Sequence, residues 1–251
     1  MGKIAIVTGG GRGLGRSTVL ALAQRGVDVF LTYQSNRAEA ELAVAEIEAL
    51  GRKAVALRLD VGDASSFPAF AAEVRRVLAD TWQDDRFDHL VNNAGHFASG
   101  TLESMTESDA DGLYNVHFKG VFFLTQALLS LIRDGGRIVN LSSGLARFTE
   151  TGTAYYGSLK AAIDMLTRYM AKELGPRGIT VNSVAPGPIE TDFGNGHVRD
   201  NAEVNRHLAA ASPFGRVGLP EDIGPMIASL LGEEHRWVTA QRIEVSGGIR
   251  L

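Results

Sequence analysis

A glycine-rich turn at the start of the chain constrains its fold more than any other feature. The apolar run Ile4 to Val7 leads directly into TGGGRGLG, Thr8 to Gly15, which is followed by a segment with helical periodicity, Leu14 to Gln24. Glycine loses more freedom on ordering than any other residue, so a loop this rich in glycine indicates close approach to a ligand. The order strand, glycine turn, helix predicts a unit that binds the phosphates of a dinucleotide.

Apolar runs and helical patterns alternate along the rest of the chain. The expected strands are 4–7, 27–32, 54–59, 89–91, 137–141, 179–184 and 242–245, and the expected helices are 14–24, 38–50, 65–78, 105–132 with a break near Gly120, 154–174 and 220–231. Continuously apolar strands alternating with helices are typical of a parallel sheet covered on both faces. We therefore predict one α/β domain over residues 1–251, a doubly wound (Rossmann) parallel sheet of about seven strands with helices on both faces.

The composition excludes several classes of function. The chain has no cysteine, which rules out disulfides and thiolate catalysis, and its six histidines are scattered, so no metal site is expected. A net charge of −4 with dispersed basic residues gives no reason to expect a nucleic-acid partner. The most apolar stretch, 116–132, is too short and too polar to span a membrane, and the N-terminus lacks a signal-peptide layout. We therefore expect a cytoplasmic protein that acts on a small molecule.

Four separate motifs together resemble the short-chain dehydrogenase/reductase family, and the likeness covers essentially the whole chain. It is closest to the group that contains 3-oxoacyl-carrier-protein reductases and glucose dehydrogenases. The motifs are T-G-x-x-x-G-x-G at Thr8, Gly9, Gly13 and Gly15, N-N-A-G at Asn92 to Gly95, a serine at Ser143 placed thirteen residues before a Y-x-x-x-K pair at Tyr156 and Lys160, and P-G at Pro186 and Gly187.

Helical geometry selects the catalytic tyrosine. Tyr156 and Lys160 lie roughly 40° apart around a helix, whereas Tyr155 and Lys160 lie roughly 140° apart, so Tyr156 shares the face of the lysine. A nearby ammonium lowers the pKa of a phenol, which suits Tyr156 to proton transfer with a carbonyl or alcohol oxygen. The family resemblance implies that Lys160 also holds the nicotinamide ribose and that Asn115 anchors a water molecule in the proton relay.

Two adjacent serines follow the expected fifth strand. Neighbouring strand residues point to opposite faces, so one of Ser142 and Ser143 reaches the site. The offset of thirteen residues from Tyr156 favours Ser143, whose hydroxyl would bond the substrate oxygen. Ser142 is then expected to bond to nearby backbone.

The resemblance implies a cofactor site drawn from several loops. Asp60 is expected at the adenine edge with Val61 beside it, although capping the next helix is a compatible role. Asn93 is expected beside the adenosine ribose, or as a tie between strands. The full expected set is Thr8, Gly9, Arg12, Gly13, Leu14, Gly15, Tyr33, Gln34, Asp60, Val61, Asn93, Ala94, Gly95, Tyr156, Lys160, Pro186, Gly187 and Thr191.

The end of the second strand bears on the choice between NADP(H) and NAD(H). An acid there would bond a ribose 2′-hydroxyl, but this chain has Tyr33 and Gln34. Arg12 matches a basic residue of many NADP-preferring relatives, and Arg37 is positioned to assist. Gln34 replaces a basic residue of some relatives. We expect NADP(H), with NAD(H) as a possible second cofactor.

These features predict an NADPH-dependent oxidoreductase that reduces a ketone or aldehyde. The alternatives are an NAD(P)-dependent alcohol or sugar dehydrogenase working oxidatively and a dinucleotide-binding sensor without turnover. The glycine-punctuated stretch at about 187–218 is expected to be a flap over the substrate. Residues expected to face the substrate are His96, Phe97, Leu145, Phe148, Phe193, His197 and His207.

The resemblance also implies a homotetramer, or a homodimer. The family's usual tetramer contacts include the end of the chain, where Gly and Asp are frequent at two positions. Ala240 and Ser246 stand at those positions here.

Overall fold

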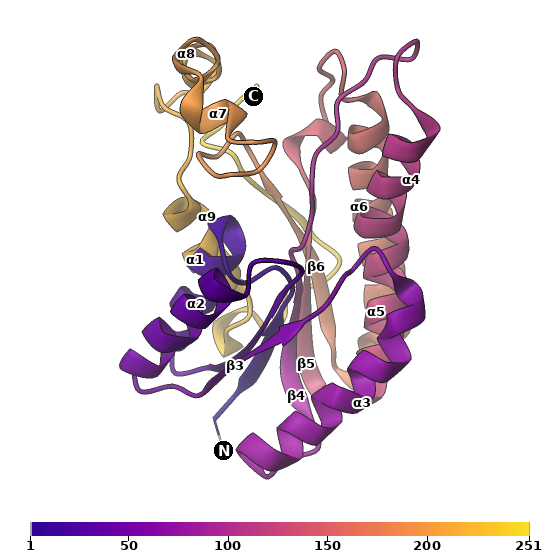
Figure 1. Cartoon of the computed structure of the whole chain (residues 1–251), viewed down its shortest axis with the longest axis vertical. Helices are drawn as coiled ribbons and strands as arrows, with labels where there is room; N and C mark the ends of the chain where they lie inside the picture. The colour runs from indigo at the N-terminus through magenta and orange to yellow at the C-terminus, as the bar shows by residue number, and fades with distance from the viewer. Residues whose placement is uncertain (1, 251) are drawn as a thin grey trace.

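A computed structural model describes residues 2–250 as one continuous seven-stranded parallel sheet with helices on both faces (Figure 1). The strand order is β3-β2-β1-β4-β5-β6-β7, so β1 and β4 meet where the chain reverses its direction of travel across the sheet. The strands are β1 (Ile4–Val7), β2 (Asp28–Tyr33), β3 (Ala54–Arg58), β4 (Phe87–Asn92), β5 (Ile132–Leu141), β6 (Thr180–Pro186) and β7 (Arg242–Val245). The expected fold class is confirmed.

The helices form a layer on each side of this sheet. Figure 1 shows α1, α2 and α9 on one side and α3, α5 and α6 on the other, with α7 and α8 beyond the carboxyl ends of the strands. The helices are α1 (Gly13–Gln24), α2 (Arg37–Ala49), α3 (Phe67–Val77), α4 (Glu107–Tyr114), α5 (Val121–Leu128), α6 (Ala154–Leu174), α7 (His197–Asp200), α8 (Ala202–Ala210) and α9 (Pro220–Leu230).

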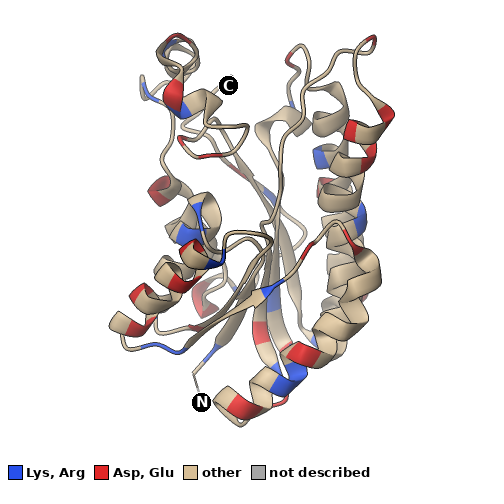
Figure 2. Ribbon diagram, viewed as in Figure 1, with Lys and Arg blue, Asp and Glu red and all other residues tan. Residues whose placement is uncertain are grey.

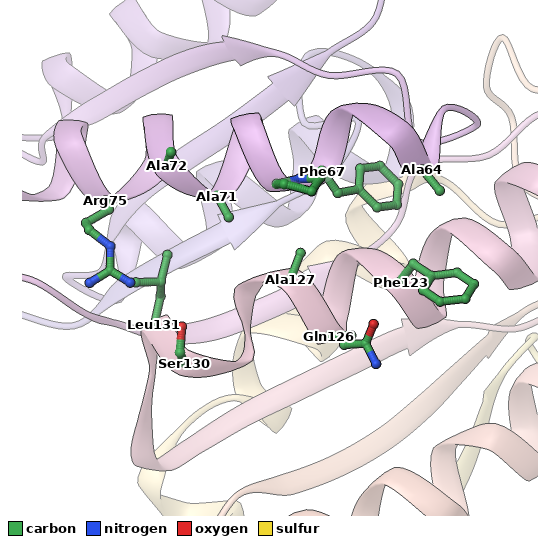
Figure 3. Close-up of a pocket in the computed structure, with 11 residues that line it drawn as sticks. Ala64, Phe67, Ala71, Ala72, Arg75, Phe123, Gln126, Ala127, Ser130 and Leu131 are labelled. Carbon is green, nitrogen blue, oxygen red and sulfur yellow. The ribbon is translucent and has the colours of Figure 1, made fainter.

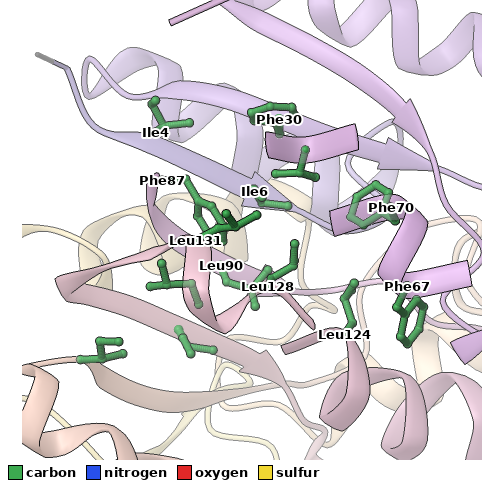
Figure 4. Packing of buried hydrophobic residues seen from close by; sticks show 14 of the residues in the cluster. Ile4, Ile6, Phe30, Phe67, Phe70, Phe87, Leu90, Leu124, Leu128 and Leu131 are labelled. Carbon is green, nitrogen blue, oxygen red and sulfur yellow. The ribbon is translucent and has the colours of Figure 1, made fainter. Parts of the chain in front are cut away.

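Alternate strand residues feed two hydrophobic cores, one on each face. Ile6 and Leu90 point toward α3, α5 and α6, where they pack among Phe67, Phe70 and Leu124 (Figure 4). Their strand neighbours point the opposite way and pack against α1, α2 and α9. Both faces of each central strand are therefore apolar, which explains why the strands read as continuous apolar runs.

Two expected boundaries differ from the structure. Strand β5 begins at Ile132 rather than Arg137, because the left-handed Gly135 forms an irregularity that lets Ile132 pair with Phe87. The expected helix 105–132 is divided by a π-helical segment, η3 (Asn115–Gly120), between α4 and α5. A Cβ on Gly120 would lie 2.3 Å from the carbonyl oxygen of Val61, so glycine is required where this segment crosses the end of the third strand.

The stretch expected to be a flap contains the short helices α7 and α8. Its ends meet in a parallel bridge between Ile189 and Gly218, where Glu190 N donates to the Gly218 carbonyl at 3.0 Å. This bridge joins the two ends of the segment, and α7 and α8 lie beyond the carboxyl ends of the strands (Figure 1).

Charged side chains of both signs are distributed along the helices (Figure 2). Among residues 2–250, none of the helices is both long enough and apolar enough to cross a bilayer.

A left-handed alanine near the last strand provides a stability prediction. Ala240 has a φ of +60°, where a Cβ costs about 1–2 kcal/mol. Ala240→Gly is expected to raise the free energy of unfolding by about 1 kcal/mol, because this relief exceeds the ~0.4–1 kcal/mol that glycine adds to unfolded-state entropy. Unfolding in urea measures this change in the free energy of unfolding. The matched control Ala45→Gly, at an exposed position inside α2, should lower stability by about 1 kcal/mol, and a loss of that size at Ala240 would contradict the argument.

Candidate active site

The residues expected at the cofactor meet at the carboxyl ends of β1 and β4, the crevice in which open α/β sheets bind ligands. The Thr8 hydroxyl accepts hydrogen bonds from Asn93 N at 2.9 Å and Ala94 N at 3.0 Å. The Asn93 side chain in turn donates to the carbonyl oxygens of Thr8 and Gly9 at 2.8 and 3.2 Å. Asn93 therefore ties the glycine turn to the loop after β4, one of the two roles expected for it.

The glycine turn is packed too tightly for side chains. A Cβ on Gly15 would lie 2.1 Å from the Gly9 carbonyl oxygen and 2.7 Å from Asn93 Nδ2. Helix α1 begins at Gly13, its N-cap residue Arg12 makes no side-chain capping bond, and its first turn holds no acid. The unpaired N–H groups and positive end of this helix fit a pyrophosphate.

Basic side chains surround the end of β2. Arg37, at the start of α2, lies near Tyr33, and Arg58, opposite Tyr33 in the sheet, donates to the Gln34 carbonyl at 3.2 Å. The Arg12 side chain is 69% exposed, with Asp192 of the flap 4.0 Å away. Arg58 is a member of this basic group that the sequence analysis did not identify, because its position opposite Tyr33 depends on strand pairing.

Gln34 and Asp60 lie together beside this group. Gln34 Nε2 donates to Asp60 Oδ2 at 3.0 Å, and Asp60 Oδ1 accepts from Gly62 N at 2.8 Å. The carboxylate thus orders the turn that follows β3 while both side chains stay exposed to a ligand.

Tyr156 is the tyrosine that faces the interior of the site. It is 6% exposed, whereas Tyr155 is 37% exposed, as helical geometry predicts. The expectation of a lowered pKa is wrong for this structure: burial raises the pKa of Tyr156, because a phenolate is poorly solvated there, and a hydrogen bond with Ser143 only partly opposes this. The phenol therefore holds its proton at neutral pH.

Lys160 lies one turn further along α6 and is also buried. Its Nζ donates to the Leu141 carbonyl at 2.7 Å and lies 5.5 Å from the centroid of the Tyr156 ring. Burial lowers the pKa of Lys160 to about 7, although the charge of Asp164 opposes the shift. The lysine therefore titrates near neutrality, which is unusual for an ammonium group.

The two serines after β5 divide as expected. Ser142 Oγ donates to the Lys160 carbonyl at 3.3 Å, which fixes the strand to α6. Ser143 lies beside the Tyr156 phenol, and its Oγ accepts from Leu145 N at 3.2 Å. The structure thus brings Ser143, Tyr156 and Lys160 together.

A helix residue in contact with Tyr156 is His117, which the sequence analysis did not single out, and the role expected of Asn115 stays a prediction. The His117 ring stands edge-on to the Tyr156 ring, with 5.2 Å between centroids and an interplanar angle of 89°. Residues two apart on a helix do not share a face, so the half-buried Asn115 lies away from this contact. His117 belongs to a buried stripe, and that stripe is the sequence signal that could have found it: Leu113, His117, Gly120 and Leu124.

Two phenylalanines from distant segments enclose the Tyr156 phenol. The Phe97 ring lies edge-on at 5.3 Å and the Phe193 ring at 6.2 Å from the Tyr156 ring, and the two phenylalanine rings are 6.0 Å apart. Phe97 follows β4, whereas Phe193 comes from the flap. Two apolar aromatic side chains therefore pack against the Tyr156 ring.

The remaining expected residues are distributed around this centre. Thr191 lies 3.5 Å from a Cβ placed on Gly13, so the flap reaches the glycine turn. Pro186 ends β6, and Gly187 N donates to the Val245 carbonyl at 3.1 Å. His197 and His207 are exposed on α7 and α8.

A groove of about 490 Å³ lies away from this centre, between α3 and α5 (Figure 3). Phe67, Ala71, Phe123 and Leu131 are among its lining residues, and none of the residues expected at the site is among them.

Comparisons with known proteins agree with this geometry. A family model described as enoyl-(acyl carrier protein) reductase matches residues 9–250. Versicolorin reductase 1 of Aspergillus parasiticus is 36% identical over 257 residues, which cover 98% of this chain and 96% of that protein.

Two solved structures are similar over nearly their whole length. The promiscuous reductase LugOII, which catalyses keto-reduction at C1 during lugdunomycin biosynthesis, has a TM-score of 0.93 at 38% identity, covering 99% of this chain and 97% of its own. The angucycline C-6 ketoreductase LanV with bound NADP has a TM-score of 0.92 at 36% identity, covering 98% and 95%.

The fold, the tyrosine–lysine pair and these similarities define an oxidoreductase that depends on a nicotinamide dinucleotide. The chain belongs to the short-chain dehydrogenase/reductase family.

Proposed function

We propose that this protein reduces the carbonyl group of a planar aromatic ketone with NADPH. The observation that carries the proposal is the position of the Tyr156 phenol, which keeps its proton and whose ring packs in one cluster with the Phe97 and Phe193 rings. LugOII and LanV are ketoreductases, and LanV was solved with NADP, which supports both the reaction and the cofactor.

Each residue of the centre has a separate role in this reaction. Bound NADPH supplies the hydride that reduces the carbonyl carbon. Ser143 donates a hydrogen bond that orients the substrate oxygen, and Tyr156 protonates that oxygen as negative charge develops on it. The Lys160 ammonium favours the resulting phenolate and holds the nicotinamide ribose. The phenol begins this sequence protonated, as a proton donor to the substrate oxygen must be.

The cofactor is held by the glycine turn and the loops that meet it. The N-terminus of α1 binds the pyrophosphate, Asp60 and Val61 border the adenine, and Thr191 bonds the nicotinamide carboxamide. Pro186 and Gly187 shape the end of β6 beside it. We propose residues 187–218 as the substrate flap of this single domain, since Phe193 brings the segment to Tyr156.

Arg12 is expected to distinguish the two nicotinamide cofactors. Arg12→Ala should raise the Kd for NADPH about 10- to 100-fold, the worth of a hydrogen bond to a charged phosphate, and leave the Kd for NADH within about twofold. Paired fluorescence titrations measure both constants. The matched control is Arg16→Ala, in the first turn of α1, which removes an ion pair with Glu46. Equal losses of NADPH and NADH affinity in Arg12→Ala would contradict the assignment.

The two phenylalanines that pack against Tyr156 are expected to set substrate preference. Phe193→Ala should raise KM for a planar bicyclic aryl ketone about 3- to 10-fold, because an aromatic pair contributes about 0.5–1.5 kcal/mol. KM for a small aliphatic ketone should change less than twofold. The control is Phe214→Ala, since Phe214 belongs to the same flap but is 74% exposed. An equal change in KM for both ketones would mean that the rings do not recognise the substrate.

We also propose that the protein is a homotetramer in the cytoplasm, with a homodimer as the alternative. Two separate exposed apolar regions support two kinds of subunit contact. One lies on α5 and α6, where Phe122, Phe123, Met165 and Tyr169 are exposed, and the other contains Trp237, close to the edge strand β7. Light scattering in solution tests this proposal, and a monomer mass would contradict it.

A further inference from the structure

His117 is a buried histidine whose tautomer the structure fixes. It is 2% exposed, and its Nε2 lies 2.7 Å from the carbonyl oxygen of His96. A carbonyl oxygen can only accept a hydrogen bond, so Nε2 carries the hydrogen and donates it. In a neutral imidazole the other nitrogen, Nδ1, then presents a lone pair.

That Nδ1 atom is buried and has no hydrogen-bond partner among residues 2–250. A buried acceptor without a partner costs about 1–3 kcal/mol, so a water molecule that bonds to Nδ1 would remove that cost. Residue 95 must be a glycine for the ring to fit, because a Cβ on Gly95 would lie 2.6 Å from His117 Cε1. The glycine that ends the N-N-A-G motif therefore leaves room for the imidazole.

The surroundings keep the imidazole neutral. Burial holds the pKa of His117 well below its usual value, and the positive charge of Lys160 lowers it further. The hydrogen bond to the His96 carbonyl acts in the opposite direction but does not outweigh burial. The titratable or charged groups around this network are His96 with Asp109, on the side of the β4 loop and α4, and Tyr156 and Lys160 with Asp164 on α6.

We propose that His117 is a positioning residue for the Tyr156–Lys160 pair, its Nδ1 accepting a hydrogen bond from a water molecule that the Lys160 ammonium also holds. This inference rests on the proposed roles of Tyr156 and Lys160. It assigns to an imidazole on this helix the task that the sequence analysis gave to Asn115.

Each proton that is transferred in this step is replaced. The Tyr156 O–H bond breaks as the O–H bond of the product alcohol forms, and the phenolate then takes a proton from the Lys160 ammonium. The lysine recovers a proton from the water held between it and His117, and the hydroxide that this leaves takes up a proton from solvent to become water again. His117 stays neutral throughout, because its part is to fix the water and the ammonium by accepting a hydrogen bond.

Two substitutions separate this role from simple packing. His117→Phe keeps a flat ring but removes the acceptor, so kcat should fall about 10- to 100-fold, with the Kd for NADPH unchanged within about twofold. The alkaline limb of the kcat–pH profile should also move to lower pH, because the ammonium loses a partner that favours its charged form. His117→Asn keeps an acceptor, because the amide oxygen of asparagine is two bonds from Cβ, as Nδ1 is in histidine. This variant should retain kcat within about threefold.

Control variants distinguish a failure of the proposed catalytic roles from a failure of the role of His117. His235→Phe changes a histidine near the end of α9 and should leave kcat and the pH profile as they are. If Tyr156→Phe remains active, the proposed catalytic roles fail. If Tyr156→Phe is inactive but His117→Phe keeps the wild-type kcat and pH profile, only the role of His117 fails.

A measurement on the unaltered protein covers the case in which His117→Phe does not fold. Nitrogen-15 NMR of histidine-labelled protein should show His117 with hydrogen on Nε2 and none on Nδ1 at neutral pH. A proton on Nδ1 would overturn the proposal.

Discussion

Replacing Tyr156 by phenylalanine is expected to lower kcat about 100- to 10,000-fold, the range that general acid catalysis contributes. The variant removes one oxygen from a buried ring and keeps the ring's contacts with Phe97, Phe193 and His117. Because those contacts remain, the Kd for NADPH should stay within about twofold. Steady-state kinetics and a fluorescence titration measure the two effects.

The adjacent residue provides the control for this substitution. Tyr155→Phe removes the same oxygen from a more exposed ring on another face of α6 and should leave kcat unchanged. A Tyr156→Phe variant with wild-type kcat would contradict the mechanism. Loss of NADPH binding in that variant would mean that the phenol serves the cofactor rather than the substrate.

Replacing Lys160 by methionine is expected to impair both turnover and cofactor binding. Methionine approximates the apolar stem of the lysine but removes the charge and leaves the Leu141 carbonyl without its donor. The kcat should fall about 100-fold or more, because the phenolate loses a stabilising cation, and the Kd for NADPH should rise about 10-fold with the loss of a ribose contact.

The titration of Lys160 gives this prediction a pH signature. Its pKa of about 7 means that the ammonium fraction falls as the pH rises through neutrality. The kcat/KM for NADPH, which reports groups of the free enzyme, should therefore decline above about pH 7 in the wild type. Lys160→Met should lack that decline. An unchanged Kd for NADPH in the variant would contradict the ribose role.

The alternation of apolar strands and helices predicted the seven-stranded parallel sheet, because strands buried on both faces leave a continuous apolar signal. The start of β5 was not predicted, whereas a break near Gly120 was expected but without its π-helical form. Both depend on backbone contacts between distant segments, at Gly135 with Gly136 against β4 and at Gly120 against Val61. Such contacts leave only a glycine in the sequence, which does not say what it approaches.

At the site, spacing correctly placed Tyr156 against Lys160 and separated Ser143 from Ser142. It did not single out His117, since residue type was weighed above the buried stripe that passes through this residue, and the role expected of Asn115 stays a prediction. The direction of the Tyr156 pKa was also wrong, because the sequence reveals the neighbouring lysine but not the degree of burial. Phe97 and Phe193 were candidates among several, and only the folded flap shows that both reach the phenol.

The most direct test of the central claim follows deuterium from the cofactor to the product. The protein is incubated with a planar bicyclic aryl ketone and NADPH deuterated at C4 of the nicotinamide, on each face in turn. We expect one of the two labelled cofactors to yield an alcohol with a single deuterium on the carbinol carbon, and Tyr156→Phe to yield almost none. Absence of the labelled alcohol with both cofactors, or equal yield from Tyr156→Phe, would contradict the central claim.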